Sequence, residues 1–189
     1  MISKEIKINF SAKAWHIKMS CTFDKLIKRP LKACFIINLQ VNRNTMKRKS
    51  TAIWQGTGME GKGVLQSTSG VLNNTPYSFT TRFKNEDGVA GTNPEELIAA
   101  AHAGCYSMAL SFALSGAGFP PAELKVSAAV NIEFMTDHFE ITGIHLDLLG
   151  DVQGITADKF QELALAAKTG CPVSQALKAV PITLDAKLK

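Results

Sequence analysis

The alternation of apolar and polar positions becomes regular after about residue 46. Short apolar segments separated by Gly- and Asn-containing turns come first, at residues 52–54, 64–65 and 77–83. In the last segment aromatic and polar residues alternate, so Arg82 is expected on the strand face opposite Phe79. The three segments together predict an antiparallel meander of strands.

The clearest helix start in the chain follows this meander. Asn93 can cap a helix, Pro94 suits its first position, and Glu96 can complete a capping box. The pattern predicts a helix to about Leu114, before Gly116. The stripe expected to be buried consists of Leu97, Ala101, Cys105, Met108 and Phe112. Because the opposite side is rich in small residues, we expect this helix to be covered on most sides and to be central to the fold.

The remaining elements alternate between strands and helices. The pattern predicts strands at 126–134, 139–149 and 182–188, a helix at 157–168 capped by Thr156, and a shorter helix from Cys171 to about Ala179. The resulting order, three strands, a helix, two strands, two helices and a strand, predicts an α+β fold with largely antiparallel strands.

Composition supports one globular domain. The chain has 189 residues, of which 46% are hydrophobic and 20% charged, and this balance excludes a disordered chain. No run approaches 18 consecutive apolar residues, so a membrane span is not expected. Four cysteines are too few for a disulfide scaffold.

The net charge of +5 is unevenly distributed. Residues 1–45 contain nine Lys/Arg and two acidic residues and carry +7, whereas residues 46–189 carry −2. The mildly acidic body does not favour a nucleic-acid partner.

Residues 1–45 have no glycine and no sustained period, and we interpret them as a basic, poorly structured extension upstream of a natural start near Met46. A mitochondrial presequence is the alternative, although such peptides favour Arg and Ser over Lys. Cys21 and Cys34 lie in this segment and are expected to have no core chemistry. Residues 46–189 are then a single domain.

Two cysteines belong to the predicted domain. Cys105 lies within the long helix among small residues, and Cys171 directly precedes Pro172 at a helix N-cap, where unpaired N–H groups favour a thiolate. They are 66 residues apart, so only the fold can pair them. The alternative is that both are small buried apolar residues.

Three further side chains are candidates for chemistry. His102 lies one helical turn before Cys105 and suits a base or charge partner, although a hydrogen-bonded structural histidine is the commoner case. His102 and Cys105 supply only two metal ligands, so no metal site is expected. Arg82 is either functional or a solvated strand charge. Glu95 favours the helix dipole and has no other assignment from the pattern.

Five motifs occur in order: SGVLN at 69–73, TRF at 81–83, GTNPEELI at 91–98, AHAGC at 101–105 and GCPVS at 170–174. Together they resemble the OsmC branch of the OsmC/Ohr thiol peroxidases. The resemblance covers residues 46–189, and residues 1–45 have no counterpart in it.

The resemblance implies an OsmC-like α+β fold in which largely antiparallel sheet wraps central helices of an intertwined homodimer. It implies that Cys105 is the peroxidatic cysteine and Cys171 the resolving cysteine. Arg82 corresponds to the arginine that steadies the thiolate, and Glu95 to its carboxylate partner. His102 also fits the pattern but is assigned no catalytic step.

The activity implied is reduction of organic hydroperoxides to alcohols, through a Cys105 sulfenic acid and a Cys105–Cys171 disulfide. No cofactor is expected, and an external dithiol, of lipoyl type in the family, would reset the pair. We expect a cytoplasmic protein of oxidative or osmotic stress defence, with no nucleic-acid or membrane partner. The alternative is a thiol redox sensor without turnover, or a small-molecule binding protein on the same scaffold.

One distance bears on assembly. Glu95 and Cys105 are ten residues apart, roughly 15 Å along one helix axis. They cannot touch within a straight helix, so either Arg82 bridges them or a partner subunit contributes. We predict a site completed across the dimer interface.

Overall fold

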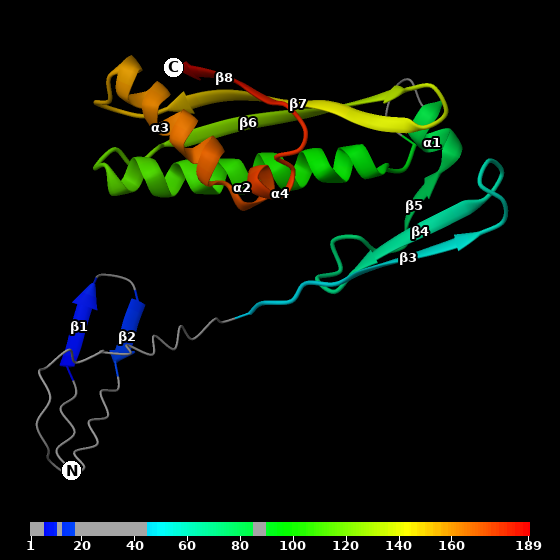
Figure 1. Cartoon of the computed structure of the whole chain (residues 1–189), viewed down its shortest axis with the longest axis horizontal. Coiled ribbons are helices and arrows are strands. Elements are labelled where there is room, and N and C mark those ends of the chain that lie inside the picture. Colours follow the sequence, from blue (N-terminus) through cyan, green and yellow to red (C-terminus); the bar gives the residue numbers. More distant parts are fainter. Residues whose placement is uncertain (1–5, 11–12, 18–44, 85–89) are drawn as a thin grey trace, which may run out of the picture. The chain divides into compact units, whose positions relative to one another are not determined.

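A computed structural model of the chain describes residues 6–10, 13–17, 45–84 and 90–189 (Figure 1). The chain divides into two compact units, Met1–Lys47 and Arg48–Lys189. The first contains strands β1 (Ile6–Phe10) and β2 (Lys13–Ile17), which pair antiparallel. The sequence predictions about Cys21 and Cys34 fall outside the described residues.

The second unit begins with the predicted meander. Strands β3 (Ser50–Gln55), β4 (Lys62–Ser67) and β5 (Thr75–Ser78) form an antiparallel sheet in that order. Every residue of β3 is exposed in the single chain, including Trp54 at 38%. The meander is confirmed, but its third strand ends at Ser78.

The strand predicted over 77–83 is therefore wrong in its second half, where the chain forms helix α1 (Phe79–Phe83). Ser78 Oγ accepts a hydrogen bond from the Thr81 backbone N–H at 3.1 Å, and Thr81 Oγ1 accepts one from the Ser78 N–H at 2.7 Å. This reciprocal capping box starts a helix despite the alternating apolar pattern. Arg82 consequently lies on a helix and not on a strand.

The long helix α2 (Pro94–Gly116) begins where the sequence predicts. Asn93 Oδ1 accepts from the Glu96 backbone N–H at 2.8 Å, which confirms the cap. The reciprocal half of the predicted box is not formed, because the Glu96 carboxylate accepts from Thr92 Oγ1 at 2.6 Å.

We expect Asn93→Ala to lower the free energy of unfolding by about 1 kcal/mol, since it leaves a first-turn N–H of α2 without its acceptor. Urea denaturation at fixed protein concentration measures the change. Asn73→Ala, which removes an exposed loop amide, is the matched control and should change stability by less than about 0.5 kcal/mol. Equal effects of the two substitutions would contradict a capping role.

A second sheet and two further helices make up the rest of this unit. Its strands are β6 (Glu123–Phe134), β7 (Phe139–Asp151) and β8 (Ile182–Leu188), and its remaining helices are α3 (Ala157–Gly170) and α4 (Pro172–Ala176). Strands β6 and β7 pair antiparallel, whereas β7 and β8 pair parallel. Helices α2 and α3 lie on one face of this sheet (Figure 1). The α+β class is confirmed, and α4 is shorter than predicted.

The core lies between this sheet and the two helices. Leu110 and Leu114 of α2 meet Leu146 of β7 and Phe160 of α3, and all four are fully buried. Gly150 of β7 permits this packing, because a Cβ there would lie 2.6 Å from the Phe160 ring. The close approach of α3 to the sheet therefore requires glycine at that position.

The buried stripe of α2 differs from the prediction. The buried residues along its middle and end are His102, Tyr106, Leu110 and Leu114. In the single chain Met108 is 63% exposed, Phe112 is 74% exposed and Ala101 is also exposed, so the predicted burial of these three is wrong for one chain taken alone. Because α2 is apolar or small on all sides, its periodicity does not reveal which side meets the sheet.

Among the described residues, α2 is also long and apolar enough to cross a membrane, by length and composition only. The sequence prediction that no membrane span is present depended on the lack of an unbroken apolar run. That criterion does not detect α2, in which small and polar residues interrupt the apolar ones. The same composition suits a helix that packs against β6 on one side and α3 on another.

Candidate active site

The fold brings the two predicted cysteines together. Cys105 lies in the middle of α2, and Cys171 caps α4 and is fully buried. Their Sγ atoms are 3.1 Å apart, and both are free thiols. A disulfide needs about 2.05 Å between sulfurs, so a small movement would close the bond.

The electrostatics of the pair are set by burial and by the start of α4. Burial raises the pKa of the Cys105 thiol, and the neighbouring Cys171 raises it further, against a backbone N–H of Val173. Burial also acts to raise the pKa of Cys171, but hydrogen bonds from the Ser174 N–H and from Cys105 outweigh it and lower that pKa.

His102 lies beside this pair without contacting either sulfur in any described hydrogen bond. Its Nε2 is 2.8 Å from Ser174 Oγ, which ties α2 to α4, and its Nδ1 has no partner in the structure. The ring is fully buried, and this burial lowers its pKa, so the imidazole is neutral near pH 7. The contact holds the N-terminus of α4, and with it Cys171, against Cys105.

Arg82 and Glu95 form a second cluster at the start of α2. Arg82 donates through Nε to Glu95 Oε2 at 3.1 Å and through a terminal nitrogen to Oε1 at 2.6 Å. The carboxylate side chain is 10% exposed and the guanidinium side chain 34%. A bidentate pair of this kind fixes the plane of the guanidinium.

Aromatic side chains surround Arg82, and the sequence analysis did not single them out. A half-open cavity of about 130 Å³ is lined by Arg82 together with Trp54, Tyr77, Phe79 and Phe83, among others. The Arg82 guanidinium carbon lies 4.8 Å from the centre of the Phe83 ring, which in turn stacks on Phe139 of β7. The TRF motif next to alternating aromatic residues was the signal in the sequence that could have identified these rings. The rings lie around Arg82 because residues 79–83 form helix α1.

Within one chain the two clusters remain apart. Glu95 lies at the second residue of α2 and Cys105 ten residues later, so about 15 Å of helix axis separates them. None of the groups that shift the pKa of Cys105 is a cation. The structure therefore brings Arg82 to Glu95 and Cys105 to Cys171, but it does not bring Arg82 to Cys105.

Comparison with known proteins shows the family of this chain. The family model described as OsmC-like protein matches residues 85–185, which include Glu95 and both cysteines. A curated relative, peroxiredoxin OsmC of Escherichia coli strain K12, is 50% identical over 145 residues, which cover 77% of this chain and 99% of that protein. The chain belongs to the OsmC family.

More distant OsmC-family relatives agree. The organic hydroperoxide resistance protein OhrB of Bacillus subtilis strain 168 is 29% identical over 130 residues, covering 67% of this chain and 88% of that one. The crystal structure of OhrB superposes with a TM-score of 0.54 at 27% identity, over 74% of this chain and 98% of that chain. These matches show the OsmC/Ohr fold for residues that include both clusters.

The reactions that this OsmC-family chain can support follow from the side chains of the two clusters. The cysteine pair offers a nucleophile and a second thiol within bonding reach, which is the arrangement for reversible disulfide formation. The Arg82–Glu95 pair offers an oriented cation beside an apolar cavity. Among the described residues, no group of three possible metal ligands includes a residue of either cluster.

Proposed function

We propose that the chain reduces organic hydroperoxides to alcohols, with Cys105 as the peroxidatic and Cys171 as the resolving cysteine. The observation that carries the proposal is the 3.1 Å contact between two free thiols in an OsmC-family chain. The relatives named peroxiredoxin and organic hydroperoxide resistance protein support a cysteine-based peroxidase role in stress defence. The reaction uses thiol chemistry and no prosthetic cofactor.

The first step is attack of the Cys105 thiolate on the distal oxygen of the peroxide. The S–O bond forms as the O–O bond breaks, and the leaving alkoxide takes a proton to become the alcohol. Cys105 is then a sulfenic acid, oxidised by two electrons, and the peroxide has been reduced by the same two.

The second step is condensation with Cys171. Its thiolate attacks the sulfenic sulfur, the S–S bond forms, and the hydroxyl leaves as water after gaining a proton. Because the two sulfurs start in contact, condensation is faster than a further oxidation of Cys105. An external dithiol, for which we propose the lipoyl type, returns both cysteines to thiols and becomes a disulfide itself.

Arg82 would lower the pKa of Cys105 and orient the peroxide, with Glu95 holding the guanidinium. These roles require the cation at the sulfur, and one chain does not place it there. We therefore infer that the site is completed across a homodimer, in which Arg82 of one protomer approaches the cysteine pair of the other. A neighbouring guanidinium would reverse the upward pKa shift that burial imposes on Cys105.

Exposed apolar surface supports an intertwined homodimer. Met108 and Phe112 project from α2, and an open groove of about 360 Å³ borders Met108, Ser111 and Leu124. Strand β3 is exposed along its whole length. Large apolar side chains on one helix face and an unburied strand are expected where a second copy packs.

We expect Phe112→Glu to convert the protein into a monomer and to reduce peroxidase activity by at least tenfold, because a charge would have to be buried in the interface. Analytical ultracentrifugation and steady-state assays measure the two effects. Leu165→Glu is the matched control, since Leu165 is 52% exposed on α3, and it should leave both unchanged. A monomeric wild type with full activity would refute the shared site.

The aromatic cavity at Arg82 supports an organic substrate. Its apolar rings can take the hydrocarbon part of a peroxide while the guanidinium meets the polar O–O group. Hydrogen peroxide would gain nothing from those rings. We therefore expect kcat/KM for cumene or tert-butyl hydroperoxide to exceed that for hydrogen peroxide by at least tenfold.

Steady-state peroxide consumption with a dithiol tests the proposal. Wild-type protein should turn over many times with dihydrolipoamide and should favour the organic peroxides. If a folded protein forms the disulfide but does not turn over with any dithiol, the alternative of a redox sensor on the same scaffold is favoured.

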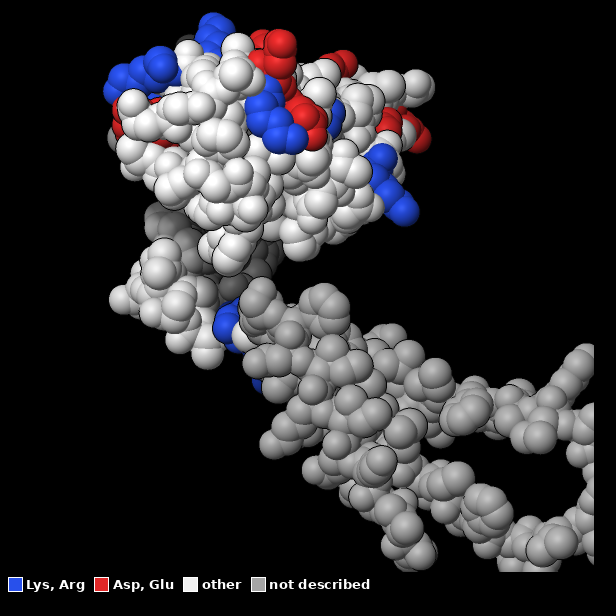
Figure 2. All heavy atoms as spheres, turned by 90° about the vertical axis from the view of Figure 1, so that its left-hand side faces the viewer, with Lys and Arg blue, Asp and Glu red and all other residues white. Residues whose placement is uncertain are grey.

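The surface charge and the extension complete the proposal. On the face drawn in Figure 2, Lys and Arg side chains lie beside Asp and Glu, which does not favour a polyanionic partner. We propose a cytoplasmic protein without nucleic-acid or membrane partners, in which residues 46–189 form the peroxidase domain. Residues 1–45 would be an extension outside it.

A further inference from the structure

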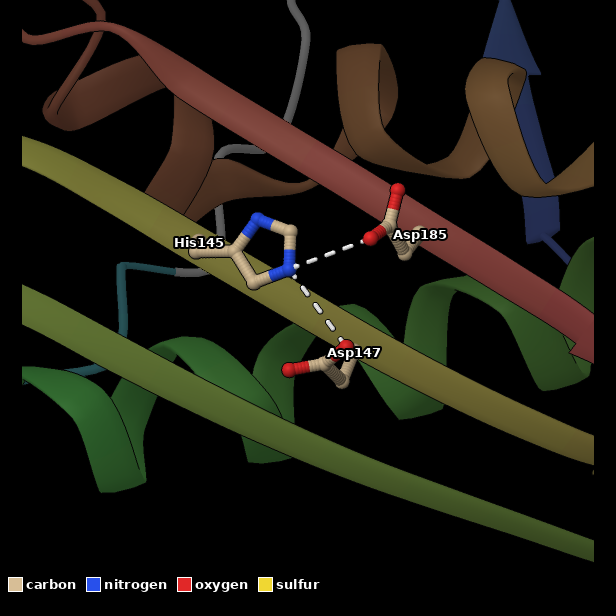
Figure 3. Close-up of side chains that lie close together, drawn as sticks. All are labelled: His145, Asp147 and Asp185. Carbon is tan, nitrogen blue, oxygen red and sulfur yellow. Dashed lines mark ion pairs between the residues drawn. The ribbon is translucent and has the colours of Figure 1, made fainter.

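A second group of polar side chains lies on the sheet formed by β6, β7 and β8 (Figure 3). His145 and Asp147 project from β7, and Asp185 projects from the parallel neighbour β8. His145 Nε2 is 3.4 Å from Asp147 Oδ1 and 3.6 Å from Asp185 Oδ2. One ligand atom from each residue lies within 4.8 Å of the others. The core-facing residues of the same strands, such as Leu146, separate this cluster from the cysteine pair.

The other ring nitrogen of His145 is held by Thr183. Its Nδ1 lies 2.7 Å from Thr183 Oγ1, and the Thr183 hydroxyl donates its only proton to the Ile144 carbonyl at 3.4 Å. With that proton used, Thr183 Oγ1 can accept a hydrogen bond from Nδ1–H of His145. The opposite ring nitrogen, Nε2, faces both carboxylates, so one cation could contact all three side chains. Metal-ligating histidines are oriented by a hydrogen bond of this kind.

The spacing fits a small tetrahedral cation. With Zn–N and Zn–O bonds of about 2.1 Å and tetrahedral angles, ligand atoms are separated by about 3.4 Å. The two nitrogen–oxygen distances are 3.4 and 3.6 Å, close to that separation. In-register pairing of Asp147 with Asp185 and of His145 with Thr183 fixes all four side chains on rigid strands.

We propose that His145, Asp147 and Asp185 bind a divalent transition-metal ion of the zinc class, with a fourth position open to water. One imidazole and two carboxylates match the borderline preference of Zn²⁺ for nitrogen and oxygen ligands. The ion would bridge β7 to the C-terminal strand β8. This site is independent of the thiol chemistry on the other side of the sheet.

Calorimetric titration of Zn²⁺ into the full chain tests the proposal, with wild type compared with Asp185→Asn. We expect the variant to lose one bound ion per chain or to bind it at least tenfold more weakly. Since thiols also bind zinc, the difference between the two proteins isolates the cluster. Asp137→Asn is the matched control, because it removes an exposed carboxylate 2.7 Å from another histidine, His138, and should leave the isotherm unchanged.

Thr183→Val provides a second measurement that does not alter a ligand. It keeps the shape and strand propensity of residue 183 but removes the acceptor for Nδ1–H, and should weaken Zn²⁺ binding by about tenfold.

A Co²⁺ titration provides a spectroscopic test. Co²⁺ bound to this cluster should show ligand-field absorption but no sulfur-to-cobalt charge-transfer band, and His145→Gln should abolish that absorption. Circular dichroism verifies that each variant is folded. Identical metal binding by wild type, Asp185→Asn and His145→Gln would overturn the proposal.

Discussion

Replacement of Cys105 by serine is expected to lower kcat/KM for organic hydroperoxides by at least a thousandfold, equivalent to about 4 kcal/mol of transition-state stabilisation. Only a thiolate attacks the peroxide oxygen readily at neutral pH, whereas a serine hydroxyl does not ionise there and has no sulfur on which a sulfenic acid could form. Steady-state consumption of cumene hydroperoxide with dihydrolipoamide measures the loss. Serine is nearly isosteric with cysteine, so the fold should persist.

Cys171→Ser is the matched variant, and it decides which sulfur reacts first. It should consume about one peroxide per chain in a rapid burst and leave a sulfenic acid that dimedone traps on Cys105. This comparison is needed because, in the single chain, the pKa of Cys171 is lowered while that of Cys105 is raised. A burst that survives in Cys105→Ser and disappears in Cys171→Ser would show that the two roles are exchanged.

Replacement of Arg82 by methionine is expected to reduce kcat/KM by about a hundredfold, through loss of the cation that stabilises the thiolate and orients the peroxide. Arg82→Lys should recover only part of this, because an ammonium cannot make the bidentate contact with Glu95. Lys84→Met, which removes an exposed cation two residues away, is the control and should be close to wild type.

The pH profile separates a catalytic effect of Arg82 from a structural one. Without the guanidinium, the pKa of Cys105 should lie higher, so a larger fraction of the enzyme is thiol at pH 7. Activity of Arg82→Met should then rise toward wild type as the pH increases and the thiolate forms. A uniform loss at every pH would instead mean that Arg82 does not act by lowering the pKa of Cys105.

Local physical chemistry explains what the sequence predicts well. Asn93 and Thr156 start helices through side-chain caps, which depend on residues three positions apart. Strand β6 alternates over more than ten residues and β7 alternates from Ile144 to Gly150, so the type of both was predictable. The family motifs identify Arg82, Glu95, Cys105 and Cys171 as candidates, with no knowledge of where they lie in space.

The same local rules explain one error. Residues 77–83 alternate like a strand, but Ser78 and Thr81 form a capping box that converts the second half into helix α1. The S-x-x-T spacing is visible in the sequence and competes with the alternation. The cap satisfies backbone groups directly, and the short aromatic segment then packs through Phe83 on Phe139.

The amino-acid sequence is enough to predict the class of the fold, the starts of its main helices and the residues that can carry chemistry. Three contacts come from the folded chain alone: Cys171 Sγ meets Cys105 Sγ, Arg82 pairs with Glu95 away from them, and β8 runs parallel to β7 and brings Asp185 to His145. The tertiary structure also decided which side of α2 is buried. These outcomes depend on contacts between residues far apart in the chain, for which periodicity and capping carry no information.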